Sequence, residues 1–386
     1  MNQPQIRLAT KEDLPALIDL WAYCFADGDI FRNWYFKYYY RQDECIVASI
    51  DGTPVASLQV IDLPTRVGGQ SLAAGYIVGV NCLPEYRGQG LTRMLMDEAL
   101  NHFAPQKGYR LLHLMPFEAD FYEPYGFVYG DYHANMTLPI EEFYSADARE
   151  EARQHHWRTV DLNDTAEMLD TLEALYDAAL EGFDAYVERH GARRWSALLD
   201  DVRLENGHLK VLYNEADEAV GYLAYIVQED ALLIREMQSL NAGARKAMYY
   251  FIASHRSQVK TVKWSAAENE PVVYRRKKDK DGVALQPFVM CKVLDPEIVG
   301  LFASKLPKEN LEFYVEGCGR YQWQAQSTTV LRTGNRKDGV ACFSLQALNR
   351  MLFERGGWFY DEADPLQKQM AALFKEKTQF FNNEYF

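Results

Sequence analysis

The chain has 386 residues, more than one ordinary domain, because a single hydrophobic core rarely grows beyond about 250 to 300 residues. Hydrophobic residues make up 48% and charged residues 25%, a balance that excludes a fibrous or wholly disordered protein and predicts two or three globular domains. The formal net charge of -14 disfavours partners that present phosphates, so we expect neither nucleic acid nor a membrane surface as a partner.

The six cysteines are scattered, without a C-x-x-C pair or neighbouring histidines at zinc spacing. We therefore expect reduced thiols and no metal site. The first ten residues lack a signal-peptide core, and no stretch approaches about 18 uninterrupted apolar residues. A cytoplasmic location is the expectation.

Residues 1–145 are predicted to form a mixed α/β domain. A strand at 6–8 precedes a helix capped by Thr10, and residues 31–40, seven of them aromatic, form either a core helix or the wall of an aromatic pocket. Asp51-Gly52 predicts a hairpin between strands 45–50 and 54–61. The pattern then predicts a strand at 73–82, a helix with Leu91, Met94, Leu95 and Ala99 inward, and a strand at 110–114. Pro105 and Gly108 together are expected to end that helix.

Residues 146–287 repeat this order more loosely. A helix at 165–183 precedes strands at 209–213, 220–227 and 232–237, and a helix at 244–255 leads into a strand at 260–264. We infer a duplicated fold. The charge run at 275–282 is interpreted as a linker to a third domain, 288–386, with strands at 311–315, 321–324 and 339–343 and helices at 345–353 and 365–374.

The most specific pattern follows the strand at 73–82. Gly88 and Gly90 let successive backbone N–H groups converge just before a helix begins, where the helix dipole adds about half a positive charge. This arrangement predicts a pyrophosphate cradle. It is neither a P-loop nor a dinucleotide fingerprint, because the Gly-Lys-Ser/Thr and G-x-G-x-x-G spacings are absent.

The wider context resembles the GNAT superfamily of N-acetyltransferases over residues 5–140. Its cofactor loop, R/Q-x-x-G-x-G/A, is matched from Arg87 to Leu91, with Thr92 where glycine or alanine is usual. The later segment Phe121-Tyr122-Glu123-Pro124-Tyr125-Gly126-Phe127 resembles the family's second landmark, in which the first tyrosine stands beside the thioester sulfur. The resemblance implies acetyl-CoA as cofactor, held by Val80, Asn81, Cys82, Arg87, Gly88, Gln89, Gly90, Leu91, Thr92, Arg93, Phe117 and Glu118.

The order of the predicted domains narrows the resemblance. Two acetyltransferase units, the second degenerate, followed by a region resembling a sterol carrier protein domain, look like the enhanced intracellular survival (Eis) family, an α/β fold. In that family the terminal carboxylate acts as the base, which gives Phe386 a role, and Tyr122 becomes the general acid, with Tyr125 as the competing donor. The aromatic end of the chain also fits a simple hydrophobic anchor.

The resemblance implies an acceptor amine: an aminoglycoside-like compound, a polyamine or a lysine side chain. We expect Asp27, Trp34, Tyr35 and Glu384 to form an acidic, aromatic-walled acceptor site. A homo-oligomer is expected by resemblance alone. Two alternatives stay open: an N-myristoyltransferase-like acyltransferase, and a lipid-binding or regulatory module that binds coenzyme A without turnover.

Overall fold

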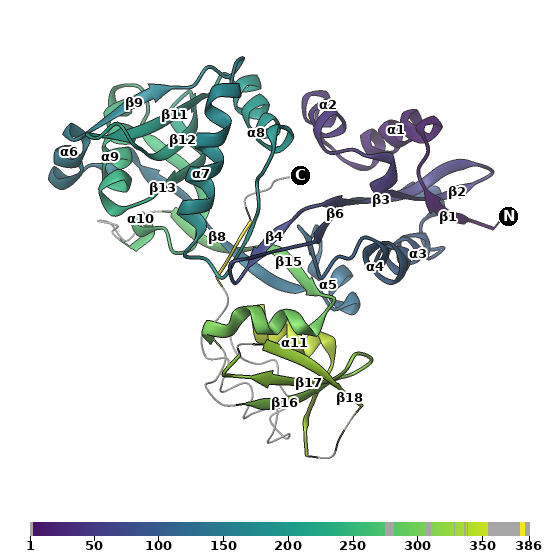
Figure 1. The fold of residues 1–386 in the computed structure, drawn as a ribbon. Helices are drawn as coiled ribbons and strands as arrows, with labels where there is room; N and C mark the ends of the chain where they lie inside the picture. Colours follow the sequence, from purple (N-terminus) through teal and green to yellow (C-terminus); the bar gives the residue numbers. More distant parts are fainter. Residues whose placement is uncertain are drawn as a thin grey trace. The chain divides into compact units, whose positions relative to one another are not determined.

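The computed structural model describes residues 3–274, 282–305, 310–327, 329–335, 337, 339–353 and 379–382. Its contacts divide the chain into two compact units (Figure 1). The first unit comprises Met1–Asp131, Phe183–Glu188 and Phe288–Phe386, and the second comprises Tyr132–Gly182 and Arg189–Pro287. These units interleave along the chain, whereas the sequence suggested three consecutive domains. The limits 1–145, 146–287 and 288–386 stay a prediction, because compact units and family domains are different divisions.

The main sheet of the first unit follows the predicted strands. Asp51 and Gly52 adopt positive φ values of 51° and 83°, as a two-residue hairpin turn requires. Neighbouring strands are antiparallel except for the parallel pair β6 and β7. In spatial order the strands are β1 (Gln5–Leu8), β2 (Cys45–Ile50), β3 (Thr53–Asp62), β6 (Ala74–Cys82), β7 (Leu111–Leu114) and the end of β15 (Gly282–Val293).

Helices cover both faces of this sheet. Successive residues of β2 face opposite sides of the sheet. Cys45 and Val47 pack with the helix at 14–24, whereas Ile46 and Ala48 pack with the helix at 91–98. Met94 was expected inward but is 38% exposed, because it lies at the edge of the apolar stripe. The helices are α1 (Leu14–Cys24) and α2 (Asp29–Tyr38), then α3 (Leu91–Glu98), the π-helical turn η4 (Ala99–Phe103) and α4 (Ala104–Gln106).

The helix ends beside Pro105 and Gly108 as predicted: its last residue is Gln106, and Gly108 has φ +70°. The π-helical turn η4 precedes Pro105, and the helical backbone continues to Gln106. Because proline lacks an N–H and crowds the preceding turn, a change of hydrogen-bond spacing before it allows the helix to continue.

A small second sheet in the first unit joins segments that lie far apart in the sequence. The hairpin of β4 (Thr65–Val67) and β5 (Gln70–Leu72) pairs with β10 (Ala185–Val187), which pairs in parallel with β20 (Phe380–Phe381). Sequence patterns gave no sign of β10 or β20, because strands of three and two residues carry almost no periodicity.

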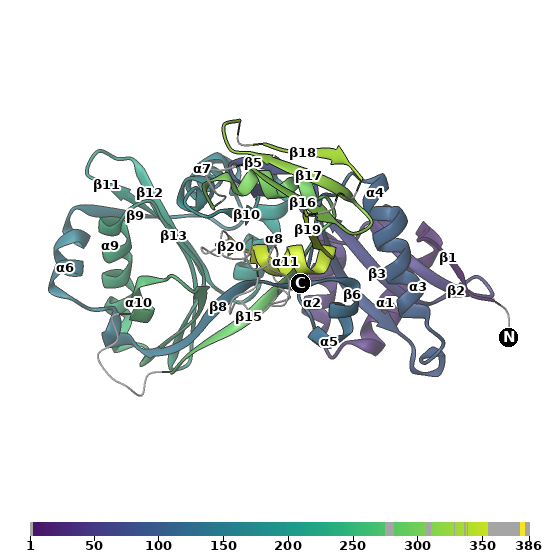
Figure 2. The ribbon, with the colours of Figure 1, turned by 90° about the horizontal axis from the view of Figure 1, so that it is seen from below.

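Among the described residues, 296–353 form a four-stranded sheet with η9 and α11 packed beside it (Figure 2). The strand order is β18-β17-β16-β19, and β19 is parallel to β16. The expected helix at 365–374 lies outside the described residues. The elements are η9 (Pro296–Lys305), β16 (Leu311–Val315), β17 (Gly319–Gln324), β18 (Thr329–Gly334), β19 (Ala341–Phe343) and α11 (Leu345–Phe353).

The second unit repeats the topology of the main sheet. Its strands run, in spatial order, β9 (His155–Thr159), β11 (His208–Asn214), β12 (Ala219–Gln228), β13 (Ala231–Ser239), β14 (Thr261–Ala267) and β8 (Val128–Pro139). Again only one pair, β13 and β14, is parallel. This agreement confirms the predicted duplication. The helices are α6 (Ala146–Arg153), α7 (Leu169–Leu180), α8 (Ala192–Leu204), α9 (Ala242–Ala253) and α10 (Pro271–Tyr274).

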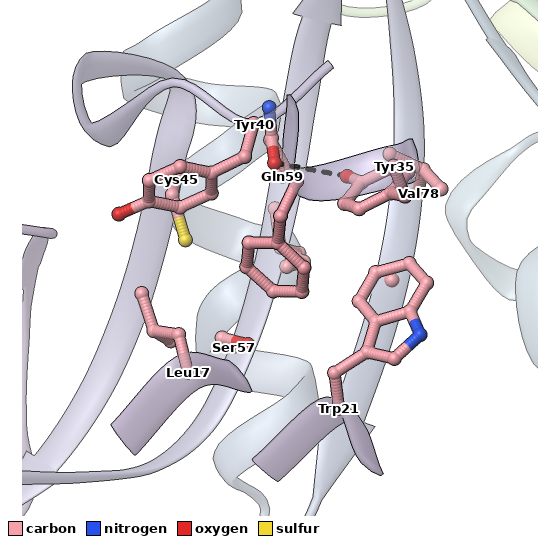
Figure 3. Close-up of a pocket in the computed structure, with 11 residues that line it drawn as sticks. Leu17, Trp21, Tyr35, Tyr40, Cys45, Ser57, Gln59 and Val78 are labelled. Atoms are coloured by element: carbon pink, nitrogen blue, oxygen red, sulfur yellow. Dashed lines mark hydrogen bonds between the residues drawn. The ribbon is translucent and has the colours of Figure 1, made fainter. Parts of the chain in front are cut away.

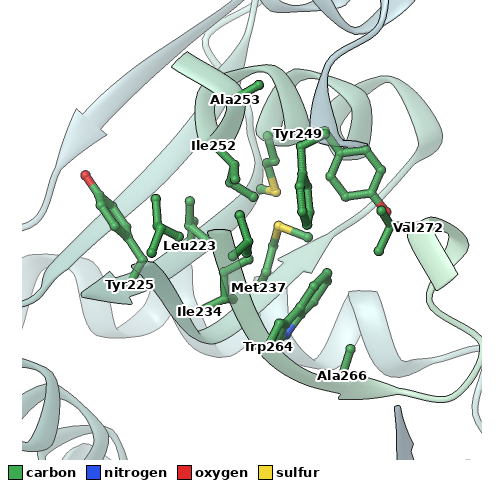
Figure 4. Packing of buried hydrophobic residues seen from close by; sticks show 14 of the residues in the cluster. Leu223, Tyr225, Ile234, Met237, Tyr249, Ile252, Ala253, Trp264, Ala266 and Val272 are labelled. Atoms are coloured by element: carbon green, nitrogen blue, oxygen red, sulfur yellow. The ribbon is translucent and has the colours of Figure 1, made fainter. Parts of the chain in front are cut away.

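The core of the second unit lies between α9 and its sheet (Figure 4). Met248 and Ile252 of α9 pack against Leu223, Met237 and Trp264 of three neighbouring strands. At about 1.5 to 3 kcal/mol for each fully buried large apolar side chain, such a cluster supplies much of the unit's stability.

The two units exchange their last strands. β8 follows β7 in the chain, yet residues 133–139 pair with β14. β15 follows β14, yet residues 290–293 pair with β7. Each sheet is therefore completed by a strand that continues from the other half of the chain, and neither half is a self-contained segment.

Candidate active site

The parallel strands β6 and β7 separate at a defined point. Their pairing ends at Ile77 opposite Leu114, whereas β6 continues to Cys82. Beyond Ile77, the described residues contain no strand on this edge of β6, so its backbone groups can pair with an extended ligand. The expected cofactor strand, which includes Val80, Asn81 and Cys82, is this stretch.

A β-bulge bends β6 at the same point. Val78 pairs with Gln59 and Asn81 pairs with Ser57, so β6 contains one extra residue between the two pairs. Gly79 has φ +63°, and a Cβ atom there would lie 2.5 Å from the ring of Trp21. Both the conformation and the space therefore require glycine.

The Trp21 ring that packs on the bulge is itself held in place (Figure 3). It stacks on Tyr35 with centroids 4.2 Å apart, and its Nε1–H donates to Asp27 Oδ2 at 3.2 Å. The Tyr35 hydroxyl donates to Gln59 Oε1 at 2.9 Å, and Gln59 Nε2 donates to the carbonyl of Tyr39 at 2.8 Å. The cavity among these side chains has a volume of about 20 Å³, enough for about one water molecule.

The expected acceptor residues therefore occupy different environments. Tyr35 is buried, and it stacks on Trp21, whose ring packs against the bulge at Gly79. Asp27 is exposed and accepts the bond from Trp21, while Trp34 is half-buried between the rings of Phe31 and Tyr39. Glu384 lies outside the described residues.

Asn81 and Arg87 hold the end of β6. Asn81 Oδ1 accepts both the backbone N–H and the hydroxyl of Ser57, each at 3.0 Å, so this side chain pins the bulge to β3. Arg87 Nε donates to the Cys82 carbonyl at 3.1 Å. For Asn81 and Cys82, the backbone rather than the side chain is therefore the group a cofactor can reach.

The glycine-rich loop after β6 has the geometry of an anion site. A 3₁₀ turn, η3 (Pro84–Tyr86), leads to Gly88 and Gly90, which have φ +76° and +77°, and Gly90 caps α3. No atom lies within 4 Å of a Cβ built at either glycine, so the backbone is open to a ligand. Arg87, Gln89 and Arg93 are exposed, Thr92 is half-buried, and buried Leu91 anchors the helix.

Tyr122 and Tyr125 lie in different surroundings after β7. Tyr122, at the end of α5 (Ala119–Tyr122), is 3% exposed, and burial raises the pKa of its hydroxyl. The described residues offer that hydroxyl no hydrogen-bond partner. Tyr125, in η5 (Glu123–Tyr125), is half-buried, and its pKa is raised by burial and by the charge of Asp97 on α3, an effect that Arg93 opposes.

An aromatic cluster positions the Tyr122 ring. Phe121 and Phe127 lie 4.9 and 6.3 Å from it between centroids, and Phe117 lies 5.8 Å away. Phe117 is itself 68% exposed, and exposed Glu118 occupies the N-cap of α5. These two side chains are therefore accessible to a ligand beside Tyr122.

The segment 379–382 docks beside the point where β6 and β7 separate. The Phe380 ring stacks on His113 of β7, and the Asn382 N–H donates to Asp131 Oδ2 at 3.1 Å. Phe380, Phe381 and Asn382 are buried. The aromatic character of this segment was the sequence signal for docking. Phe386 lies outside the described residues.

The corresponding region of the second unit differs in its side chains. Asn241 caps α9 with its own side chain, accepting from the Ala244 N–H at 2.8 Å, and a Cβ at Gly243 would lie 2.8 Å from Glu151 Oε2. On β13, which also has a bulge, Glu236 is buried in an ion pair with Arg189 at 2.7 Å. The start of α9 is therefore capped by a side chain of the chain itself, whereas Gly90 at the start of α3 gives no side-chain cap.

Within the described ranges, no group of three or more His, Cys, Asp or Glu side chains is arranged to hold a metal ion. None of the helices in the same ranges is long and apolar enough to cross a membrane.

Solved structures show the same fold. A probable N-acyltransferase of unknown function from Enterococcus faecalis V583 is 19% identical, with a TM-score of 0.75 over 90% of this chain and 89% of that chain. A GCN5-related N-acetyltransferase from Anabaena variabilis is 18% identical, with a TM-score of 0.75 over 98% and 99%. Eis1 from Mycobacterium abscessus is 14% identical, with a TM-score of 0.74 over 99% and 100%. At these identities the likeness concerns the fold alone.

Two segments of the chain also match known protein families. Residues 5–130 match a family described as an acetyltransferase (GNAT) domain, and residues 185–293 match a second family with the same description. No curated protein sequence matches the chain. GNAT domains use acyl-CoA. The chain thus consists largely of two tandem GNAT domains, and it is an N-acetyltransferase.

Proposed function

We propose that the first unit transfers an acetyl group from acetyl-CoA to an amine of a polycationic acceptor, as in the Eis family. One observation carries this proposal: the unpaired end of β6 leads directly into the open Gly88–Gly90 loop. Pantetheine would pair with the strand, and the pyrophosphate would bind the loop N–H groups at the start of α3. The side-chain cap on α9, the helix that corresponds to α3 in the second unit, supports a single cofactor site.

The chemistry proposed for this site is direct transfer. The amine nitrogen attacks the thioester carbonyl carbon, the carbon–sulfur bond breaks, and the thiolate must gain a proton. A backbone N–H at the β6 bulge would stabilise the oxyanion, and the fixed bulge costs no reorganisation during the reaction.

Tyr122 is the proposed acid. Burial keeps its hydroxyl protonated at neutral pH, so that it is available as a donor. The same apolar surroundings raise the pKa of a departing thiol, because they disfavour its thiolate, and the two pKa values therefore move in the same direction. Tyr125 is less suitable, since Asp97 and Arg93 of α3 influence its hydroxyl.

The carboxylate of Phe386 is the proposed base that accepts the proton of the acceptor ammonium. Support comes from the docked segment 379–382, which precedes Phe386 by four residues in the sequence. The net charge of -14 favours cationic acceptors such as aminoglycosides, polyamines or lysine side chains. We further propose a sterol carrier protein-like domain at 288–386, a homo-oligomer and a cytoplasmic location.

The test is to mix the protein with acetyl-CoA and a panel of polyamines, aminoglycosides and lysine peptides while free thiol is measured. Amine-dependent thiol release, with acetylated product in the mass spectrum, is expected for at least one class. Binding of acetyl-CoA without turnover on any amine would instead favour a non-catalytic coenzyme A-binding module.

A further inference from the structure

Three side chains from the last third of the chain bind the loop that follows Tyr122. Lys292 Nζ donates to the carbonyl of Tyr125 at 2.6 Å. Gln346 Nε2 donates to the carbonyl of Glu123 at 3.1 Å, and Asn349 Nδ2 donates to the carbonyl of Gly126 at 3.1 Å. Side chains from distant parts of the sequence therefore donate hydrogen bonds to three of the four backbone carbonyls in the turn 123–126.

Asn349 is the most deeply placed of the three. Its side chain is completely buried, and its Oδ1 accepts the backbone N–H of Val293 at 2.9 Å. Val293 belongs to β15, which pairs with β7. One carboxamide thus connects strand β15 of the main sheet to the end of the Tyr122 loop, and a buried amide with both ends bonded fixes the distance between them.

The loop needs such support because it is short. α5 has four residues and η5 has three, lengths at which a helix is not stable by itself in water. Gly126 closes the turn with φ +88°, and a Cβ at that position would lie 3.0 Å from Lys292 Nζ. The aromatic rings around Tyr122 bury its side chain. The direction of the backbone that follows it is set instead by the hydrogen bonds from Lys292, Gln346 and Asn349.

We propose that Lys292, Gln346 and Asn349 are positioning residues that orient Tyr122 toward the thioester. Residues 288–353 thereby contribute to catalysis through the 123–126 turn. This inference rests on the proposed role of Tyr122 as the acid.

A double-mutant cycle between Tyr122→Phe and Asn349→Leu in the full chain tests the coupling. Asn349→Leu alone should lower kcat tenfold or more while the KM for acetyl-CoA changes less than twofold. In the Tyr122→Phe background, the same substitution should lower kcat less than twofold further, because the group it positions is absent.

Two milder variants keep the test valid if Asn349→Leu fails to fold. Lys292→Met and Gln346→Leu each remove one bond to the turn and should show the same split between kcat and KM, with smaller losses. Gln322→Leu, a half-buried glutamine on β17 without a bond to the turn, is the matched control and should leave both constants unchanged.

The outcomes separate the two proposals. If Tyr122→Phe lowers turnover but the double variant loses the product of the two single effects, the positioning inference is overturned and the acid stands. If Tyr122→Phe retains full turnover, the proposed acid is overturned, and the positioning inference with it.

Discussion

The phenyl ring of Phe380 stacks on the imidazole of His113, with centroids 5.2 Å apart and planes 16° from parallel. This contact joins the end of the described chain to β7 one residue before β6 and β7 separate. The His113 ring is also held by the Thr65 hydroxyl at 2.9 Å, and Cys291 Sγ lies 3.6 Å from its other nitrogen. The docked segment therefore rests on a fixed surface.

Phe380→Ala should release this segment. Truncation of a buried phenylalanine costs about 3 to 5 kcal/mol, enough to undock a two-residue strand. We expect turnover to fall at least tenfold while the affinity for acetyl-CoA, measured by calorimetry, stays within twofold. A chain extended by several residues after Phe386 should show the same split, and full activity in that chain would exclude the terminal carboxylate as base.

His113 should make stability sensitive to acid. Burial lowers its pKa from 6.5 to about 3. Between these values the unfolded chain binds the proton and the folded chain does not, so stability is lost as the pH falls below about 6.5. The loss should reach about 2 kcal/mol at pH 5. Urea unfolding from pH 7 to 4 measures it, and His113→Gln should flatten the profile; equal slopes in both proteins would contradict the assignment.

Gly79→Ala should damage the bulge. The positive φ costs an alanine about 1 to 2 kcal/mol, and the added methyl would displace the ring of Trp21. We expect a lower melting temperature and at least a tenfold loss in kcat. Gly52→Ala is the control, since Gly52 also has positive φ but has open space around it. A kcat loss of similar size in both variants would show that the bulge has no specific role.

Acetyl-CoA should bind once per chain. Asn241→Ala removes the side chain that caps α9 and should cost about 1 kcal/mol in stability. It should not create a second site, because Glu151 and the Arg189–Glu236 ion pair remain. Calorimetric titration of both proteins checks the stoichiometry, and two equivalents bound by the natural chain would contradict a single cofactor site.

Tyr122→Phe should lower turnover far more than Tyr125→Phe does. Of these two tyrosines, Tyr122 is the deeply buried one, with 3% of its surface exposed. Tyr125→Phe instead removes a hydroxyl near α3 and should mainly raise the KM for acetyl-CoA, by a few-fold. Steady-state kinetics with one good amine distinguishes the two, and comparable losses in kcat would mean that the acid is misassigned.

Local patterns predicted the parts of the fold that depend on local physics. The hairpin at Asp51-Gly52, the strand that ends at Cys82 and the loop around Gly88 each follow from a few adjacent residues. The exchange of β8 and β15 and the pairing of β20 depend on residues more than a hundred positions apart, and periodicity carries no information about such partners. Lys292, Gln346 and Asn349 are ordinary polar residues in the sequence, and only the fold reveals their shared target.

The strand exchange has a consequence for biosynthesis. The main sheet of the first unit is complete only when residues 290–293 have been synthesised. Its small sheet is complete only after residues 380–381 have been synthesised. The N-terminal half must therefore leave the ribosome with an open sheet edge beside β7, a state prone to aggregation until the later strands arrive. Chains truncated before residue 288 should accordingly depend on chaperones or precipitate, even though the glycine-rich loop is intact.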